Sequence, residues 1–313
     1  MAPFRILSLS GGGYQGLFTA HVLAAIEAAG PGPLRDRFDL IAGTSIGGII
    51  ALALAAGIPA ATIVKAFQER GPSIFPNGAS GGGRLSAARD ALRYLSHPKY
   101  DPGPLRDLMC AFPLPEMTLS ELPVEVLIPA TRVRDGEPVL FSCSGFGDLG
   151  VVDVALATSA APMMFPTHRI GEEAYADGAI FATAPDLLAI QAAQRDQGAD
   201  LSRIHMLSVG TLNARFRLPA PVTSRLGILG WVGGHRLVRT VLAAQERLTT
   251  RTCTELIGDR YRRIDAEVGE PEGEQIGLDL ATPQAMDRIG QIAARTIRSL
   301  EMACPPHWGG TLP

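Results

Sequence analysis

The 313-residue sequence is poor in cysteine, in aromatic residues and in net charge. Its four cysteines are scattered, with no Cys-x-x-Cys pair and no histidine at ligand spacing, so we expect buried free thiols, no disulfide framework and no metal site. Aromatic residues make up only 6% of the chain, so the core must consist mainly of Ala, Leu, Val and Ile. The net charge of −3 differs from the strongly basic composition that is typical of proteins binding nucleic-acid polymers.

Two further absences concern secretion and membranes. The chain has no charged segment followed by an apolar run and a cleavage site, so we expect no secretion signal and a cytoplasmic location. Residues 40–64 contain no charged residue over 25 positions, which is the length of a transmembrane helix. Gly43, Gly47, Gly57 and Pro59 interrupt this run, however, and favour a buried strand and helix over a membrane span.

Apolar segments of strand length alternate with segments of helical periodicity along the chain. This alternation predicts a three-layer α/β fold, in which a mostly parallel central sheet is flanked by helices. No internal repeat and no clear linker divides the sequence, so we expect one domain over residues 1–313, with the motif-bearing part at about 4–211. Residues 212–313 add a strand and helices that complete the domain and offer a cap or regulatory surface. The expected strands are Phe4–Leu9, Phe38–Ala42, Val124–Thr131, Pro138–Cys143, Tyr175–Ala179, Arg203–Val209 and Tyr261–Val268.

A serine lies on the turn between the second expected strand and the following helix, within Gly43-Thr44-Ser45-Ile46-Gly47. Glycines two positions before and two positions after the serine let neighbouring backbone pass without Cβ clashes. The turn lifts the Ser45 hydroxyl clear of the sheet, next to a helix N-terminus whose free N–H groups favour negative charge. The spacing therefore indicates a nucleophile elbow, although small residues are also common at such turns for packing alone.

A glycine-rich loop, Ser10-Gly11-Gly12-Gly13-Tyr14-Gln15-Gly16, follows the first strand and precedes a helix. Strand, loop and helix N-terminus together form a cradle of backbone N–H groups that can hold an anion. Parallel strands end at the same edge of a sheet, so the loop and Ser45 converge on one acyl carbonyl. We therefore expect an oxyanion hole whose donors are the amides of Gly11, Gly12, Gly13 and Gly16.

The same loop satisfies Gly-x-Gly-x-x-Gly, so a dinucleotide-binding protein is an alternative from a different class. That interpretation needs an acidic residue at the end of the second strand to hold a ribose. Asp36 lies 20 residues after Gly16, but it precedes the second strand, which ends instead in Gly43-Thr44-Ser45. The pattern therefore favours acyl chemistry over dinucleotide binding.

Three other segments bear on a functional site. Asp177 lies at the end of an expected strand, as Ser45 does, within an Asp-Gly pair that is also common in plain turns. Pro162-Met163-Met164-Phe165-Pro166 either packs in the core or lines an acyl-chain pocket. Residues 71–104 are rich in Gly, Pro, Ser and Arg, and a loop of this length is either a lid or a surface insertion.

Taken together, these motifs resemble those of the patatin-like phospholipase family. Gly11–Gly16 resembles the oxyanion loop of that family, Gly43–Gly47 its nucleophile turn, and Asp177-Gly178-Ala179 its Asp-Gly-Ala/Gly motif. Ala157–Pro162 is similar to the small-residue stretch that precedes this aspartate in the family. The motifs occur in the family's order over about residues 4–211. The sequence departs from the family at Gln15, where Arg or Lys is usual.

The resemblance implies a hydrolase of lipid acyl esters with a Ser–Asp dyad, in which Ser45 is the nucleophile and Asp177 the general base. It implies no cofactor and no metal, and membrane phospholipid as the substrate, met at the inner face of the membrane. The competing mechanism is a Ser-His-Asp triad, whose base would be His205 or His235. An aspartate of ordinary pKa, about 3.9, is a poor base for a serine hydroxyl, so the dyad requires apolar surroundings.

Some bacterial members of similar size are anti-phage effectors that cyclic oligonucleotides activate, and the resemblance implies such an activator, and homo-oligomers on activation, for this chain. Residues 215–263 contain ten arginines. Such a block usually forms a solvated surface. The more specific alternative is that it binds an anion. Arg236, Arg239 and Arg247 are the candidates for pairing with phosphate. Segments 71–104 and 228–232 would then cover the resting site, and the alternative is a constitutive hydrolase without nucleotide control.

Overall fold

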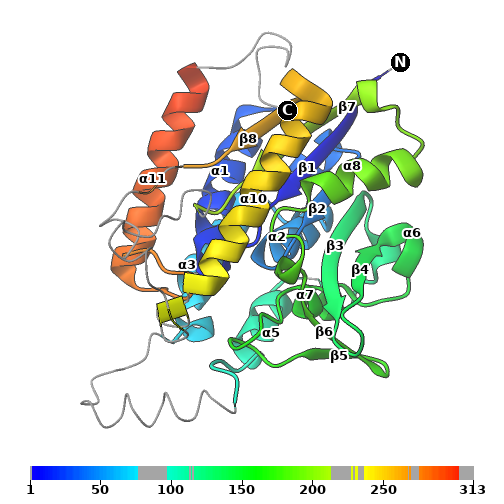
Figure 1. Cartoon of the computed structure of the whole chain (residues 1–313). Helices are drawn as coiled ribbons and strands as arrows, with labels where there is room; N and C mark the ends of the chain where they lie inside the picture. Colours follow the sequence, from blue (N-terminus) through cyan, green and yellow to red (C-terminus); the bar gives the residue numbers. More distant parts are fainter. Residues whose placement is uncertain are drawn as a thin grey trace.

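The computed structural model describes residues 2–76, 97–112, 114, 116–212, 227, 230–231, 236–266, 268 and 275–302. Its centre is a mixed eight-stranded sheet in the order β5-β6-β3-β2-β1-β7-β8, with β4 paired to β3 outside this path (Figure 1). The strands are β1 (Phe4–Leu9), β2 (Leu40–Gly43), β3 (Glu125–Arg132), β4 (Pro138–Ser142), β5 (His168–Ile170), β6 (Glu173–Asp177), β7 (Ile204–Val209) and β8 (Tyr261–Ile264).

The middle of the sheet is parallel, as the sequence predicts. Strands β3, β2, β1, β7 and β8 run in one direction, whereas β4, β5 and β6 form antiparallel pairs at one side. Leu9 at the end of β1 pairs with Gly43 of β2 and with Val209 of β7, so these three strands end level with one another. The loop after β1 and the turn after β2 therefore leave the sheet at the same edge.

Helices enclose the sheet on both faces because side chains alternate along each strand. Leu7, Ile41 and Leu207 face one core, and their neighbours in the strands face the other. The first core also contains helices α1 (Gly16–Ala29), α2 (Ile46–Ala55), α3 (Ala60–Ile74), α5 (Gly103–Cys110), α7 (Val151–Thr158) and α11 (Pro283–Met302). The second core is closed by α8 (Asp186–Arg195) and by the C-terminal half of α10 (Arg236–Ile257), and a short helix, α6 (Cys143–Phe146), follows β4. The expected three-layer α/β fold is confirmed.

The charge-free run at residues 40–64 forms β2, the turn at Ser45, helix α2 and the first turn of α3. Every residue of α2 is buried, because a helix that is apolar on all sides is stable only inside the protein. In the part of the chain that the structure describes, no helix is both long enough and apolar enough to cross a membrane.

Several boundaries differ from the sequence-based expectation. Helix α3 continues past Arg70 to Ile74 despite Pro72, so the expected loop at 71–104 begins later, and its residues 77–96 lie outside the described ones. Of the antiparallel pair β5–β6, the sequence predicts only β6 and not β5. Strand β8 ends at Ile264, before the expected Val268. Among the cysteines, Cys253 is buried as expected and Cys110 is exposed, so the prediction of buried thiols is wrong for Cys110.

Candidate active site

Ser45 occupies a tight turn between β2 and α2. Its backbone angles, φ 56° and ψ −125°, lie in a region that residues with a Cβ rarely adopt. A Cβ on Gly47 would overlap the carbonyl oxygens of Leu9 and Ser10, and a Cβ on Gly43 would overlap the backbone of Gly47. The glycine spacing therefore permits the close backbone approach on which the turn depends.

The Ser45 hydroxyl donates a hydrogen bond of 2.6 Å to Oδ2 of Asp177. Asp177 ends β6, where it pairs with Ala130 of β3. Ala42 of β2 pairs with Leu127 of β3, so the paired ends of β2 and β6 lie three residues apart along β3. Asp177 is held in turn by the amide of Ala179, which donates 2.8 Å to Oδ1. Two residues 132 positions apart in the sequence thus meet at one edge of the sheet.

The Asp177 carboxyl is 3% exposed. Burial raises its pKa from 3.8 to about 7, against the hydrogen bonds from Ser45 and Ala179, which lower it. No described residue forms an ion pair with Asp177 to offset the burial. A carboxylate whose pKa lies near neutrality is a far stronger base than an exposed aspartate. The site therefore provides the apolar surroundings that a Ser–Asp dyad requires.

Thr158, at the end of α7, fixes the turn from its other side. The Ser45 amide donates to Thr158 Oγ1 at 3.0 Å, and the Thr158 hydroxyl donates to the carbonyl oxygen of Pro129 at 2.6 Å. Thr158 lies within the small-residue stretch 157–162, to which the sequence analysis assigns no contact. A hydroxyl at the end of a helix whose only other polar residue is Asp153 is the one signal that could have singled it out.

The glycine loop passes directly beside Ser45, since a Cβ on Gly11 would lie 3.2 Å from the Cβ of Ser45. The Gly11 amide, however, donates 2.8 Å to the carbonyl oxygen of Thr183. The Gly16 amide donates to carbonyl oxygens of the preceding turn. These two glycines of the expected oxyanion hole thus already use their N–H groups within the fold.

The amides of Gly12 and Gly13 have no acceptor among the described residues. Both glycines line the cavity that holds Ser45 and Asp177. The four donors expected from the sequence therefore reduce to two candidates, Gly12 and Gly13.

Gln15 replaces the usual cation of this loop and is buried. Its Nε2 donates 2.6 Å to the carbonyl oxygen of Ile276, and the amide of Tyr14 donates 2.7 Å to the carbonyl oxygen of Leu278. Gly13 has φ 57°, and a Cβ there would overlap the Leu278 carbonyl oxygen. A neutral side chain thus anchors the loop to the segment that precedes α11.

The cavity at Ser45 has a volume of about 360 Å³ and is almost entirely apolar. Residues 162–165 line it, as the acyl-pocket interpretation of that segment predicts, together with the N-terminal half of α10. Several large apolar side chains at this cavity are exposed, including Met163 at 61% and Leu237 at 50%. The site is therefore a lipophilic groove with an apolar rim, and no histidine is among the described residues that line it.

The other candidate residues lie away from Ser45. His205 is the second residue of β7, at the end of the strand opposite to the Ser45 edge, and His235 is outside the described residues. Asp36 belongs to a 3-10 helix before β2, so the acid required for dinucleotide binding is at the wrong end of that strand. Among the described residues, neither the Ser-His-Asp triad nor dinucleotide binding thus has its required residue beside Ser45.

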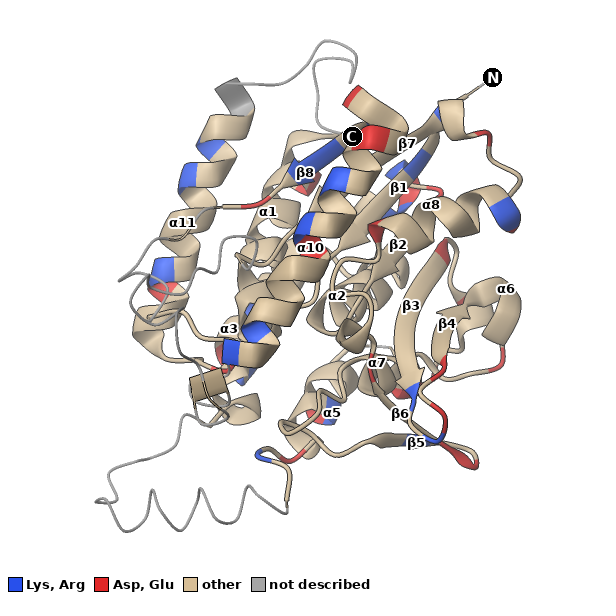
Figure 2. Cartoon of the chain, viewed as in Figure 1, with Lys and Arg blue, Asp and Glu red and all other residues tan. Residues whose placement is uncertain are grey.

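The candidate arginines of α10 and Arg263 of β8, all within segment 215–263, lie in different surroundings. Arg236, Arg239 and Arg247 lie on α10, where Figure 2 shows basic residues along the helix. Arg263 on β8 is instead buried and forms an ion pair of 2.6 Å with Glu246 of α10, which is 1% exposed. The interpretation of this block as a solvated surface is wrong for these two residues, because each neutralises the other's charge inside the protein.

A serine on a strand-to-helix turn, bonded to a buried carboxylate and beside two free amides, is the arrangement of a serine hydrolase that acts on acyl groups. The sequence model of the patatin-like phospholipase family matches residues 7–190. The chain belongs to this family and is a hydrolase of carboxylic ester bonds.

Relatives are similar over most of the chain. A "cGAMP-activated phospholipase" from Pseudomonas aeruginosa is 31% identical, with 94% of this chain and 86% of the relative covered. A protein of the same name from Vibrio cholerae is 33% identical, with 91% and 88% covered. Among solved structures, human GIVD cytosolic phospholipase A2 has a TM-score of 0.48 and 11% identity, with 96% of this chain and 59% of that chain covered. Both bacterial names specify a phospholipase and its activation by cGAMP.

The close backbone packing of the turn at Ser45 predicts that any side chain at Gly47 lowers the stability of the fold. We expect Gly47→Ala to lower the free energy of unfolding by about 1–3 kcal/mol, because the new Cβ collides with fixed backbone. Gly227→Ala is the matched control, since a Cβ there meets no described residue within 4 Å. Urea denaturation measures both, and equal stability of the two variants would contradict this account of the turn.

Proposed function

We propose that this protein is a phospholipase of the A type, which hydrolyses membrane phospholipids through Ser45 and Asp177. The observation that carries the proposal is the 2.6 Å hydrogen bond from the Ser45 hydroxyl to a buried carboxylate of raised pKa. Asp177 accepts the proton as Ser45 Oγ attacks the ester carbonyl carbon, and the amides of Gly12 and Gly13 bind the oxyanion.

The second half of the reaction uses the same groups. The tetrahedral intermediate collapses to an acyl-serine, and the proton on Asp177 passes to the departing alkoxide oxygen, which becomes a hydroxyl of the lysophospholipid. Asp177 then accepts a proton from the water that attacks the acyl carbon, and it returns this proton to Ser45 Oγ as the fatty acid leaves. Each proton that Asp177 takes up is therefore returned, and no metal or cofactor takes part in any step.

The apolar groove supports a lipid acyl chain as the bound group. A cavity of about 360 Å³ with almost no polar lining excludes water from a hydrocarbon chain. The polar head group of the lipid then lies at the rim of the cavity. The exposed Met163 and Leu237 at this rim can enter the surface of a bilayer. We infer that the enzyme meets its substrate at the inner face of the membrane.

Asp177→Asn tests the dyad, because asparagine keeps the shape of the side chain and removes the base. We expect kcat/KM for a soluble ester to fall by about 10²–10⁴-fold, as for loss of a general base. In the parent, kcat/KM should rise with pH through about 7, since the active form of Asp177 is the ionised one and its pKa is about 7. The variant should lose this dependence on pH.

His205→Gln is the control for the competing triad, because His205 lies at the far end of β7. It should retain the parental kcat/KM and the parental pH profile. A folded Asp177→Asn enzyme with near-parental turnover, or a His205→Gln enzyme without turnover, would contradict the dyad.

We further propose that a cyclic dinucleotide activates the enzyme, as the names of the bacterial relatives state for those proteins, and that it acts as an anti-phage effector. An uncontrolled phospholipase would attack its own cell's membrane, so a closed resting state is required. Helix α10 supports this role: at about 100° per residue, Arg236, Arg239 and Arg247 fall within one sector of about 80°. The residues of α10 that line the cavity point to the opposite side. A ligand bound by these arginines would therefore contact the same helix that lines the groove.

Reversing these charges tests activation separately from chemistry. We expect Arg239→Glu and Arg247→Glu to raise the cGAMP concentration needed for phospholipid hydrolysis by about tenfold or more, because a bidentate phosphate contact is lost. Hydrolysis of a small soluble ester without ligand should be unchanged. Fatty-acid release from vesicles with and without cGAMP measures the first effect, and size-exclusion chromatography shows whether ligand also drives assembly.

Arg298→Glu is the matched control, since Arg298 is an exposed arginine on α11, away from the groove. It should respond to cGAMP like the parent. If the α10 variants respond equally well, or if the parent is fully active without ligand, the constitutive hydrolase is the correct alternative.

A further inference from the structure

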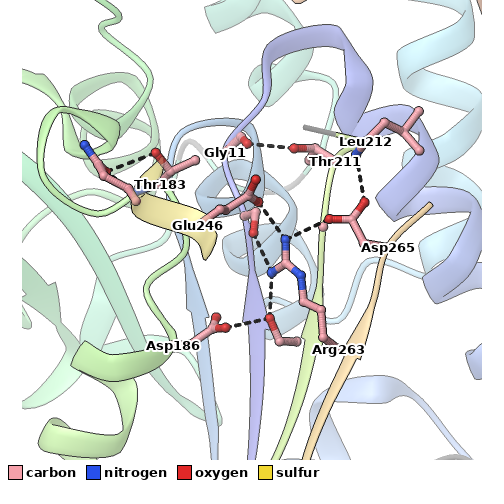
Figure 3. Close-up of polar contacts among 12 residues, drawn as sticks. Gly11, Thr183, Asp186, Thr211, Leu212, Glu246, Arg263 and Asp265 are labelled. Atoms are coloured by element: carbon pink, nitrogen blue, oxygen red, sulfur yellow. Dashed lines mark hydrogen bonds and ion pairs between the residues drawn. The ribbon is translucent and has the colours of Figure 1, made fainter. Parts of the chain in front are cut away.

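The guanidinium of Arg263 lies directly behind the glycine loop. Its Nη1 donates 2.9 Å to the hydroxyl of Ser10, the residue before Gly11, and 2.8 Å to the hydroxyl of Ser208 on β7. Its Nη2 donates 2.6 Å to Glu246 and 2.9 Å to Asp265 (Figure 3). One buried cation thus joins the loop to β7, β8 and α10, and among the described residues none of its partners is hydrogen-bonded to Ser45.

The partners of Arg263 explain why a charge is tolerated there. Glu246 and Asp265 supply opposite charge at hydrogen-bond distance, and Asp265 also accepts 3.0 Å from the amide of Leu212. A buried ion that loses one partner is strongly disfavoured, so the guanidinium is confined to this position. The Ser10 hydroxyl that it holds is confined with it.

A second set of contacts holds the next residue of the loop. The amide of Gly11 donates to Thr183, as described above, and the carbonyl oxygen of Gly11 accepts 2.7 Å from the hydroxyl of Thr211 (Figure 3). Thr183 is in turn bonded to Gln245 of α10: the amide and the hydroxyl of Thr183 each donate 3.1 Å to Oε1 of Gln245. The neighbouring residues Gln245 and Glu246 therefore reach the loop by two separate routes.

We propose that Arg263 and Glu246 are positioning residues for acyl transfer: through Ser10 they fix the loop that carries the Gly12 and Gly13 amides, and they tie it to α10. This inference rests on the proposed function of those amides. Donors of an oxyanion hole work only when they are held in place before the reaction, and a displacement of about 1 Å can cost about 10²-fold in rate. Because Leu237, Val238, Val241 and Leu242 of the same helix line the groove, one helix connects the groove and its arginine-bearing side to the oxyanion loop.

Ser10→Ala tests the link between Arg263 and the glycine loop with the smallest change, because Arg263 keeps its other three partners. We expect kcat for a small soluble ester to fall about tenfold with KM within about twofold of the parent, since the oxyanion forms only after binding. Ser208→Ala is the matched control: it removes the other acceptor of the same nitrogen, equally buried, and also a 2.8 Å bond to Asp186. It should lower Tm at least as much as Ser10→Ala does, yet leave kcat within about twofold.

Glu246→Ala tests the connection to α10 in the same assay, with Glu255→Ala as its control. Glu255 lies on the same helix, but it is exposed and its pair with Arg251 spans 3.9 Å. Glu246→Ala should lower kcat about tenfold, and Glu255→Ala should not change it.

If folded Ser10→Ala has the parental kcat, the positioning role is wrong. It is also wrong if Ser208→Ala lowers kcat as much as Ser10→Ala does, because kcat would then follow stability. Ser45→Ala in the same assay separates this failure from a failure of the proposed function. If Ser45→Ala hydrolyses the ester at the parental rate, the proposed function is wrong and the positioning role falls with it.

Discussion

The hydrogen bond between Ser45 and Asp177 depends on where β2 and β6, which run in opposite directions, end along β3. Strand β2 runs parallel to β3 and β6 runs antiparallel to it, and their last paired residues, Ala42 and Asp177, lie opposite Leu127 and Ala130 of β3. A slip of one residue in either pairing would turn the side chains of that strand to the other face of the sheet. The register of β3 with its neighbours is therefore the constraint on which the site depends, and the cores on both faces of the sheet maintain it.

The same apolar surroundings serve both the chemistry and the substrate. The groove that suits a hydrocarbon chain also removes water from Asp177 and raises its pKa to about 7. This has a cost in stability. Between pH 3.8 and about 7 the unfolded chain has released the proton that Asp177 keeps in the folded protein, so the contribution of Asp177 to the free energy of unfolding falls as pH rises through that window. The backbone of Ser45, with φ 56°, adds strain at the same place.

Much of the site could be predicted from the sequence because its parts are local patterns. The glycines around Ser45, the glycine loop and Asp177 each lie where a strand ends, and parallel strands bring such ends together. Contacts between distant segments could not be predicted. The partner of Gln15 is 261 positions away, and the Gly11 amide is occupied by a carbonyl of residue 183. Arg263 was indistinguishable from a surface arginine in sequence, because only the packing of α10 against the sheet buries it with Glu246.

The central claim is that Ser45 attacks an acyl carbon whose oxygen rests on two backbone amides. A crystal structure of the protein after reaction with a fluorophosphonate, which forms a tetrahedral adduct on an activated serine, tests it most directly. The account predicts phosphorus bonded to Ser45 Oγ and the phosphoryl oxygen within about 3 Å of the amide nitrogens of Gly12 and Gly13. Phosphorus on any other residue, or a phosphoryl oxygen that contacts neither amide, would contradict it.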